Sequence, residues 1–253
     1  MLRITTWNVN GLRAAVRKGF RGMVETVAPD VLLLQEIRCR HDEVAPEAWA
    51  GFHASFNSAE RAGYSGTALW SRSPHTRKET MAPDTEGRVL VAEVGAVTVV
   101  SVYLPSGSAG AEAQARKDQF CSRFLPWSAE LAARGGPVVL GGDLNVAPTA
   151  SDIHDPKGNA RNSGFLPHER AWFAQLLGCG WTDLVRTAVG PKQGPWTWWS
   201  NRGRARIEDR GWRIDHLLGN EAAAACLVGA GVLRDGGLVV SDHAPVWVDL
   251  SVG

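Results

Sequence analysis

The stretch Pro137-Val138-Val139-Leu140-Gly141-Gly142-Asp143-Leu144-Asn145 passes from a proline through an unbroken apolar run to a carboxylate and an amide. An uninterrupted apolar run of this length is typical of a strand that is covered on both faces. The segment Asp30-Val31-Leu32-Leu33-Leu34-Gln35 has the same character. The sequence therefore predicts strands that are buried between other layers of the protein.

Other segments complete this pattern. We expect further strands over residues 2–9, 66–71, 88–94, 97–103, 196–200, 213–218, 227–233 and 245–250. Gly95-Ala96 predicts a hairpin between two of them. Helical spacing is less frequent and predicts helices over residues 13–27, 111–134 and 167–177, the second of them broken or kinked at Pro126. Many strands with few helices indicate an α/β protein with two packed sheets flanked by helices.

Length and composition favour one globular domain that spans residues 1–253. Of the 253 residues, 44% are hydrophobic and 21% are charged, a balance that excludes disordered, collagen-like and coiled-coil proteins. No linker is long enough to separate two domains. Lys and Arg total 27 and Asp and Glu total 26, so a nucleic acid would have to bind through a local basic surface.

The cysteines and the apolar segments bear on where the protein works. The four cysteines are far apart and form no Cys-x-x-Cys pair, which argues against a zinc ribbon or a disulfide scaffold and favours the cytoplasm. No signal peptide is visible at the first residues, and no stretch approaches the roughly 18 apolar residues that span a bilayer. We expect a monomer without membrane contact. Tryptophan is unusually frequent, 11 residues against two tyrosines, so some indoles are candidates for a binding surface.

Polar side chains gather where the expected strands end: Asn8, Glu36, Tyr103, Asp143, Asn145, Asp215, Asp242 and His243. Carboxylate and amide oxygens suit Mg²⁺ or Mn²⁺ rather than zinc. Mg²⁺ usually takes only one or two protein carboxylates, which leaves the other acids free for different roles. A metal, a carboxylate and a histidine together suit the hydrolysis of a phosphodiester.

Each of these residues also has an ordinary structural interpretation. Asp143 could cap a helix or form a turn, and Asn8 to Gly11 could be a simple turn. Glu36 could be a surface acid, and Asp242-His243 could cap a helix. Asp215 is harder to explain in this way because it interrupts an apolar strand, and a buried acid without a partner is costly. Their joint presence favours a site.

Five motifs resemble the exonuclease III family of apurinic/apyrimidinic (AP) endonucleases, within the endonuclease/exonuclease/phosphatase superfamily. They are Leu34-Gln35-Glu36, Gly63-Tyr64-Ser65-Gly66, Gly142-Asp143-Leu144-Asn145-Val146-Ala147-Pro148, Gly211-Trp212-Arg213-Ile214-Asp215 and Ser241-Asp242-His243-Ala244-Pro245. The resemblance runs from Leu2 to Leu250. Gly-Asp-Leu-Asn and Ser-Asp-His are shared across the superfamily, whereas residues 155–165 and 196–199 resemble its DNA-repair branch. The resemblance implies a four-layer α/β sandwich, with two packed mixed β-sheets flanked by helices and the site at one edge.

The resemblance also implies a metal site. Glu36 corresponds to the principal Mg²⁺ ligand, with Asn8 and Asp242 nearby, and Asp143 and Asn145 are further possible ligands. Arg38 stands where many members of the family have lysine, so it keeps the charge with a different geometry.

The catalytic roles that the family implies fall on five residues. Asp143 orients or deprotonates the attacking water, and Asn145 positions that water. His243 contacts the scissile phosphate and is oriented by Asp215. Tyr103 contacts the phosphate, and either Tyr103 or Asp143 protonates the leaving group.

DNA-binding positions follow in the same way. The resemblance implies a pocket for an extrahelical base-free sugar, with further contacts at its edge and to phosphates, from Arg38, Asn159, Asn162, Trp198, Trp212, Arg213 and Ile214. Trp198 and Trp199 are adjacent on an alternating segment, so one of the two rings is expected in the core. Ser106 replaces an asparagine that many members have, and the loop 107–110 lacks an arginine that some relatives insert into DNA.

We therefore expect a Mg²⁺-dependent AP endonuclease that binds double-stranded DNA with abasic sites or 3′ ends. It would cut 5′ to the abasic site, with 3′-to-5′ exonuclease or 3′-end-processing activity from the same site. Alternatives are another phosphoesterase of the superfamily (an RNA deadenylase, an inositol-phosphate phosphatase or a sphingomyelinase) and a DNA-binding protein without catalysis. A phosphatase would have more basic groups and fewer indoles in the pocket.

Overall fold

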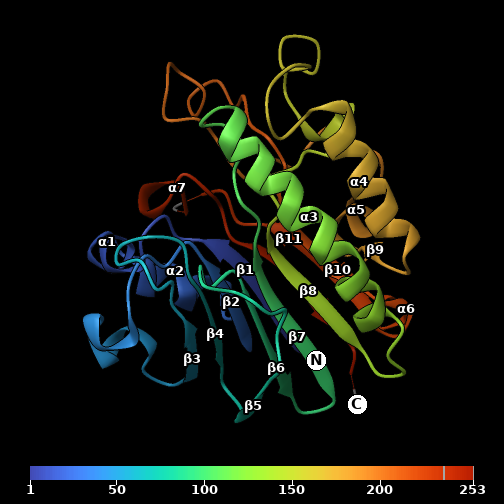
Figure 1. Cartoon of the computed structure of the whole chain (residues 1–253). Helices are drawn as coiled ribbons and strands as arrows, with labels where there is room; N and C mark the ends of the chain where they lie inside the picture. The colour runs from blue at the N-terminus through green and yellow to red at the C-terminus, as the bar shows by residue number, and fades with distance from the viewer. Residues whose placement is uncertain (236, 253) are drawn as a thin grey trace.

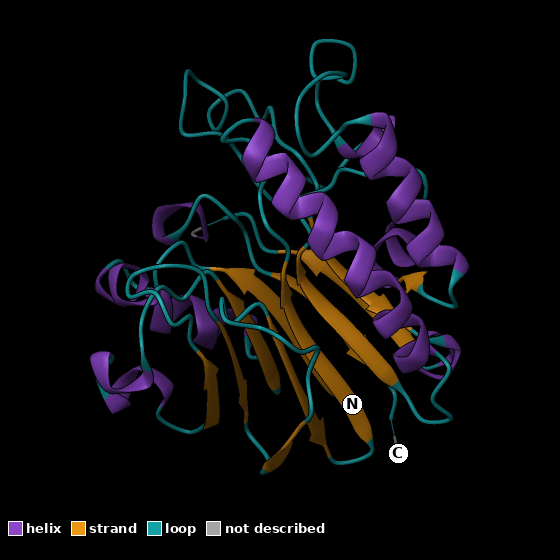
Figure 2. Ribbon diagram, in the orientation of Figure 1, coloured by secondary structure: helices purple, strands orange, loops and turns teal. Residues whose placement is uncertain are grey.

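Two mixed six-stranded sheets pack face to face in the computed structural model, which describes residues 1–235 and 237–252 (Figure 1). The first sheet has the order β11 (Leu227–Val232), β12 (Val246–Leu250), β1 (Leu2–Asn8), β2 (Val31–Gln35), β4 (Thr67–Ser71) and β3 (His53–Asn57). The second has the order β5 (His75–Lys78), β6 (Val89–Val94), β7 (Val97–Tyr103), β8 (Val138–Asp143), β10 (Asp215–Gly219) and β9 (Thr182–Asp183). Helices cover the outer faces, so the expected four-layer α/β sandwich is confirmed (Figure 2).

Strand pairing places the polar residues of the second sheet directly beside one another on neighbouring strands. β7 runs parallel to β8, and β10 runs antiparallel to it. Asp143 is therefore opposite Tyr103 on one side and Asp215 on the other. In the first sheet, Asn8 ends β1 beside the end of β2, from which Glu36 follows. The sheets thus bring five expected site residues to one edge of the sandwich.

The core between the sheets explains the apolar runs. Leu33 of β2 and Val139 of β8 are fully buried in the same cluster, as the unbroken pattern predicts. Burial of one such side chain contributes roughly 1.5–3 kcal/mol. The two glycines before Asp143 permit close approach, since a Cβ on Gly142 would lie 1.8 Å from the carbonyl oxygen of Val102.

Seven α-helices are described, namely α1 (Leu12–Arg17), α2 (Phe20–Val27), α3 (Ala111–Ala132), α4 (Pro167–Gly178), α5 (Leu184–Val189), α6 (Glu221–Ala225) and α7 (Gly237–Val240), with three 3₁₀ turns at His41–Glu43, Pro46–Trp49 and Ala150–Asp152. The helix expected over residues 13–27 is two helices, because Gly19 has a left-handed φ of 97°. Of the two effects expected at Pro126, a break is wrong and a kink stays a prediction: α3 continues through the proline, with Phe124 and Leu131 packed in one core on either side of it.

Residues 196–200 are not a strand, since only Trp198 forms isolated bridges, to Trp212 and His243. Strands β3, β5 and β9 and the helices α5 to α7 were not expected from the sequence. In the two ranges that the structure describes, no helix combines the length and the apolar character needed to cross a membrane.

Candidate active site

A cavity of about 290 Å³ lies where β2, β7 and β8 end. In Figure 1 these strand ends form the edge of the sandwich away from the two chain termini. Ten of the expected site residues line the cavity: Glu36, Arg38, Tyr103, Asp143, Asn145, Trp198, Trp212, Ile214, Asp242 and His243. Asn8 and Asp215 lie directly behind its wall, in contact with Asp143 and His243. Asn159 and Asn162 line an adjoining hollow of about 580 Å³. Arg213, also expected at the site, lines neither of these two cavities.

Asn8 joins the two sheets at the base of the cavity. Its amide nitrogen donates to Glu36 Oε2 at 3.0 Å and to Asp143 Oδ2 at 2.9 Å, and its oxygen accepts the backbone N–H of Asn10. Asn8 therefore presents its nitrogen to the two carboxylates in this structure, and its place in the metal site stays a prediction. The side chain fixes the relative position of two acids that come from different sheets.

His243 is held between two carboxylates. Its Nδ1 lies 2.9 Å and 3.1 Å from the two oxygens of Asp215, and its Nε2 lies 3.9 Å from Asp143 Oδ2. Burial by itself lowers the pKa of His243, but the carboxylates of Asp215, Asp143 and Asp242 outweigh it and raise the pKa above the ordinary value. The histidine is thus protonated at neutral pH, with Nε2 aimed toward Asp143.

Burial has the opposite effect on Asp143. It raises the pKa of this carboxyl well above the ordinary value, and Asp215 adds to the rise. The charge of His243 and hydrogen bonds from Asn8 and Asn145 oppose it without cancelling it. A carboxyl whose pKa lies closer to neutrality is suited to take up and release a proton during a reaction.

The charges around the cavity fit a divalent cation. Two cationic groups, Arg38 and His243, face the four carboxylates of Glu36, Asp143, Asp215 and Asp242. This leaves a formal excess of two negative charges, and the donors are hard oxygens. Asp143, Asp215 and His243 also offer ligand atoms that all lie within 4.8 Å of one another. Glu36 and Asp242 add further carboxylate oxygens to the same cavity.

Tyr103 completes the floor of the cavity. Burial raises the pKa of its hydroxyl well above the ordinary value, and Glu36 and Asp143 add to the rise. The guanidinium of Arg88 stacks 4.9 Å from the tyrosine ring and donates to the Tyr103 carbonyl at 3.0 Å. The phenol therefore stays protonated and can donate a hydrogen bond to an anion.

Asp242 has a different environment from the other acids. Asn10 Nδ2 donates to one of its oxygens at 2.8 Å, and the indole of Trp198 donates to the other at 3.1 Å. Burial alone would raise the pKa of Asp242, but His243 and these two hydrogen bonds lower it. Asn10 is a site residue that the sequence interpretation treated as part of a turn.

Backbone strain gathers at the same place. Among the residues that the structure describes, seven non-glycine residues have positive φ, and four of them line the cavity. They are Asn10, Glu36, Arg38 and Asn145, with φ between 47° and 54°. Left-handed backbone at Glu and Arg is uncommon and persists only where the surrounding structure imposes it, as is typical of functional sites.

Two indoles form the outer wall of the cavity. Trp198 and Trp212 meet edge to face, with ring centroids 6.0 Å apart, and pack with Ile214. Trp199 is fully buried and donates to Asp209, so the expectation of one ring in the core is confirmed. The rings of Trp198 and Trp212 thus add apolar surface to a cavity that also carries carboxylates, and the Trp198 indole N–H donates to one of them, Asp242.

Arg213 corrects one of the DNA-binding expectations. Its side chain is 2% exposed and contacts Asp152 at 2.6 Å, Asp183 at 2.7 Å and His216 at 3.1 Å. A buried guanidinium between two carboxylates cannot reach a phosphate of the backbone. Arg38, also expected to face DNA, directs its Nε to Glu36 Oε1 at 2.9 Å and remains partly exposed.

Comparisons with known proteins agree with this geometry. The family model described as Endonuclease/Exonuclease/phosphatase family matches residues 5–243. An exodeoxyribonuclease of Bacillus subtilis is 34% identical over 258 residues, covering 99% of this chain and 100% of that protein. DNA repair nuclease APEX1 of Danio rerio is 34% identical over 267 residues, covering 99% of this chain and 83% of that protein. The solved structure of an AP endonuclease from Archaeoglobus fulgidus matches with a TM-score of 0.91 at 25% identity, covering 100% of both chains.

Proposed function

The chain belongs to the endonuclease/exonuclease/phosphatase family, and from that membership we infer that it is a Mg²⁺-dependent DNA-repair nuclease, an AP endonuclease that cuts 5′ to abasic sites. From the same site we expect 3′-to-5′ exonuclease or 3′-end-processing activity. The observation that carries the proposal is the meeting of Glu36, Asp143 and His243 in one cavity whose outer wall is indole.

Glu36 would hold the metal ion, with Asp143 and Asp242 nearby and Asn145 within the same cavity. When bound, Mg²⁺ neutralises charge on the phosphate. Asn8 keeps Glu36 and Asp143 apart at a fixed distance through its amide nitrogen.

Each of the remaining side chains has a separate role in the reaction. Asp143 orients a water and takes its proton as the water attacks phosphorus, and Asn145 helps to position that water. His243, charged and held by Asp215, stabilises the phosphate oxygens, and the hydroxyl of Tyr103 donates to them. The bond from phosphorus to O3′ breaks, and the leaving oxygen takes a proton from Asp143 or Tyr103 to become a 3′-hydroxyl.

The indole wall supports an abasic substrate over the alternatives. A base-free sugar costs less to extrude than an intact nucleotide, and a tight apolar pocket of Trp198, Trp212 and Ile214 excludes one that carries a base. The phosphate of an inositol or a free nucleotide would favour basic groups there instead. A protein that only binds DNA would have no need of the buried acids and histidine.

The adjoining hollow supports contacts to the duplex. Asn159, Asn162, Arg161 and Arg202 line it, next to Trp212. Contacts of arginine and amide side chains to phosphates give affinity that does not depend on sequence. We further propose that residues 1–253 form one catalytic domain that acts as a cytoplasmic monomer, in keeping with four free cysteines.

A nicking assay tests the proposal. A duplex with one abasic analogue should be cut 5′ to the lesion in Mg²⁺ and spared in EDTA, whereas an intact duplex and single-stranded RNA should be cut far more slowly. Asp143→Asn should lower the rate by about 10²–10⁴-fold and leave DNA affinity largely intact. The surface variant Glu25→Gln is the matched control and should keep full activity. An uncut abasic duplex together with turnover of a phosphoinositide would favour the phosphatase alternative.

A further inference from the structure

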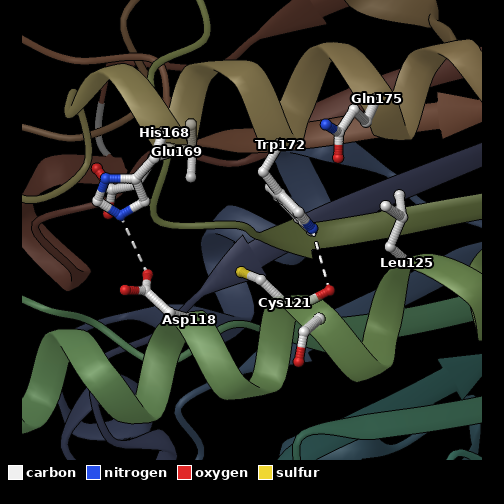
Figure 3. A pocket seen from close by; sticks show the side chains of 9 residues that line it. Asp118, Cys121, Leu125, His168, Glu169, Trp172 and Gln175 are labelled. Atoms are coloured by element: carbon white, nitrogen blue, oxygen red, sulfur yellow. Dashed lines mark hydrogen bonds and ion pairs between the residues drawn. The ribbon is translucent and has the colours of Figure 1, made fainter.

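Helices α3 and α4 lie against each other behind the active-site edge, with a cavity of about 390 Å³ between them (Figure 3). Two contacts join the helices in Figure 3, from His168 to Asp118 and from Trp172 to the carbonyl of Cys121. Glu169 lines the end of the cavity and forms an ion pair with Lys117. The two side chains are only 1% and 2% exposed.

Lys117 contacts the backbone of Asn145, which lines the active-site cavity. Its ammonium donates to the backbone oxygen of Asn145 at 2.8 Å. Asn145 has a φ of 51°, and its backbone N–H donates to Asp143 Oδ1 at 2.9 Å. Its side-chain amide donates to the carbonyl of Leu104 at 2.9 Å. Asn145 is thus fixed at three polar groups. Its backbone N–H donates to the proposed base Asp143, its side-chain amide donates to Leu104, and its backbone carbonyl accepts from Lys117.

Glu169 organises the neighbouring wall. One of its oxygens accepts the backbone N–H groups of Gly164 at 2.7 Å and Leu166 at 2.9 Å. Gly164 packs against Trp212 and the carbonyl of Asn145, where an added Cβ would lie 3.0 Å and 3.2 Å away. The carboxylate thus fixes the conformation of the loop at Gly164, which packs against the backbone carbonyl of Asn145.

We propose that Lys117 and Glu169 form a positioning pair, which holds Asn145 and the loop at Gly164 in the conformation that the reaction needs. The proposal rests on the proposed function, since it assigns Asn145 to the reacting end of the site. Apolar side chains could fill this space at least as favourably as two buried charges. What apolar side chains could not supply is a directed hydrogen bond from the lysine to a strained backbone carbonyl.

The experiment compares two variants that differ only at the lysine. Glu169→Gln keeps an oxygen for the loop amides and keeps the lysine as donor to Asn145. The double variant Lys117→Met with Glu169→Gln removes that donor without leaving a buried charge. We expect the double variant to lose roughly 10- to 100-fold in kcat on the abasic duplex at saturating Mg²⁺, with KM unchanged within about twofold. The single variant should lose less kcat than the double variant, although it should be the less stable of the two, because it leaves the Lys117 ammonium buried without its carboxylate.

Cys121→Ala is the control for stability. Cys121 lies one turn along α3 from Lys117 and lines the cavity, whereas the hydrogen bonds of Asn145 go to Lys117, Asp143 and Leu104. This change should lower the melting temperature and leave kcat unchanged when the assay is run well below the transition. Equal losses of kcat in Cys121→Ala and in the double variant would overturn the proposal, as would a double variant that keeps the kcat of the single one.

Amide hydrogen exchange separates this proposal from the proposed function. We expect the Asn145 amide to exchange faster in the double variant than in Glu169→Gln or Cys121→Ala. Failure of the wild type to cut abasic DNA would reject the nuclease assignment alone. Unchanged exchange at Asn145 would reject the positioning role whichever substrate the enzyme prefers.

Discussion

Arg213→Met distinguishes a structural arginine from a DNA contact. The substitution keeps most of the side-chain length but removes the guanidinium that Asp152 and Asp183 share. Asp152 retains Arg186, at 2.5 Å, whereas Asp183 loses the arginine that lies 2.7 Å away. Removing one partner of a buried ion pair typically costs about 3–5 kcal/mol, because the other charge stays buried.

The expected loss is large on the scale of thermal unfolding. In a protein of this size, each kcal/mol shifts the melting temperature by about 2–4 °C, so Arg213→Met should melt roughly 6–20 °C lower. Melting is followed by circular dichroism. Affinity for an uncut abasic duplex is measured in EDTA, at several salt concentrations and below the transition.

Salt dependence gives the second readout. Each phosphate contact contributes about 0.9 to the slope of log K against log salt concentration. The slope should not change in Arg213→Met, whereas Arg202→Met, at an exposed residue of the adjoining hollow, should reduce it by about 0.9 with little loss of stability. A stable Arg213→Met protein with a reduced slope would refute the structural role and restore Arg213 as a phosphate contact.

Three further outcomes are expected. Asp215→Asn removes the charge that orients His243, so the single-turnover cutting rate should fall by roughly 100-fold or more with DNA affinity retained; an unchanged rate would contradict this role. Trp212→Ala should reduce the preference for abasic over intact duplex in a competition assay, and it should leave the Mg²⁺ concentration for half-maximal activity unchanged. Burial alone would raise the pKa of Asp183, but Arg213 and His216 outweigh it and hold the pKa well below its ordinary range. This carboxylate therefore stabilises the fold above about pH 4, and the contribution is lost as pH falls toward the folded pKa. Asp183→Asn should be about 3 kcal/mol less stable than the wild type at pH 7, and urea unfolding should find that this difference in the free energy of unfolding narrows as pH falls below about 4; a difference that stays constant on further acidification would contradict it.

The central strands could be predicted from the sequence because they are buried on both faces. β2 and β8 are continuous apolar runs, and all of their residues are buried. The edge strands β3 and β5 lack this signal. Every residue of His75–Lys78 is polar, and pairing with Val91 and Ala92 of β6 holds it in the sheet. An edge strand of this kind depends on its neighbour and carries little pattern of its own.

Candidate site residues could be predicted where they lie next to a buried strand. Asp143 ends β8, Glu36 directly follows β2 and Asp242 shortly precedes β12; the three meet in the cavity, although more than 200 residues separate Glu36 from Asp242. Asn10 was missed because an Asn-Gly pair is explained equally well by a turn. Its contact with Asp242 requires the segment between α7 and β12 to lie beside the end of β1, with which β12 pairs. No local sequence pattern encodes this long-range packing.

The error at Arg213 has a simpler cause. Side chains of an extended segment point alternately to opposite sides. Trp212 and Ile214 both line the cavity, so the residue between them must point away from it. Assigning all three to the DNA surface was inconsistent with extended backbone. The same alternation separates Trp198, at the cavity wall, from Trp199, in the core.

These observations give a physical reason for the strain and the buried charge around the site. The acids come from both sheets: Glu36 follows β2 of the first, and Asp143 ends β8 of the second. Their spacing therefore depends on how the sheets pack, and Asn8 fixes it with one amide nitrogen. Loops that leave the two sheets must then turn sharply to surround the cavity, which requires left-handed backbone at Glu36, Arg38 and Asn145. Such conformations cost free energy and persist only where the surrounding structure imposes them, a support that the buried Lys117–Glu169 pair would supply behind Asn145.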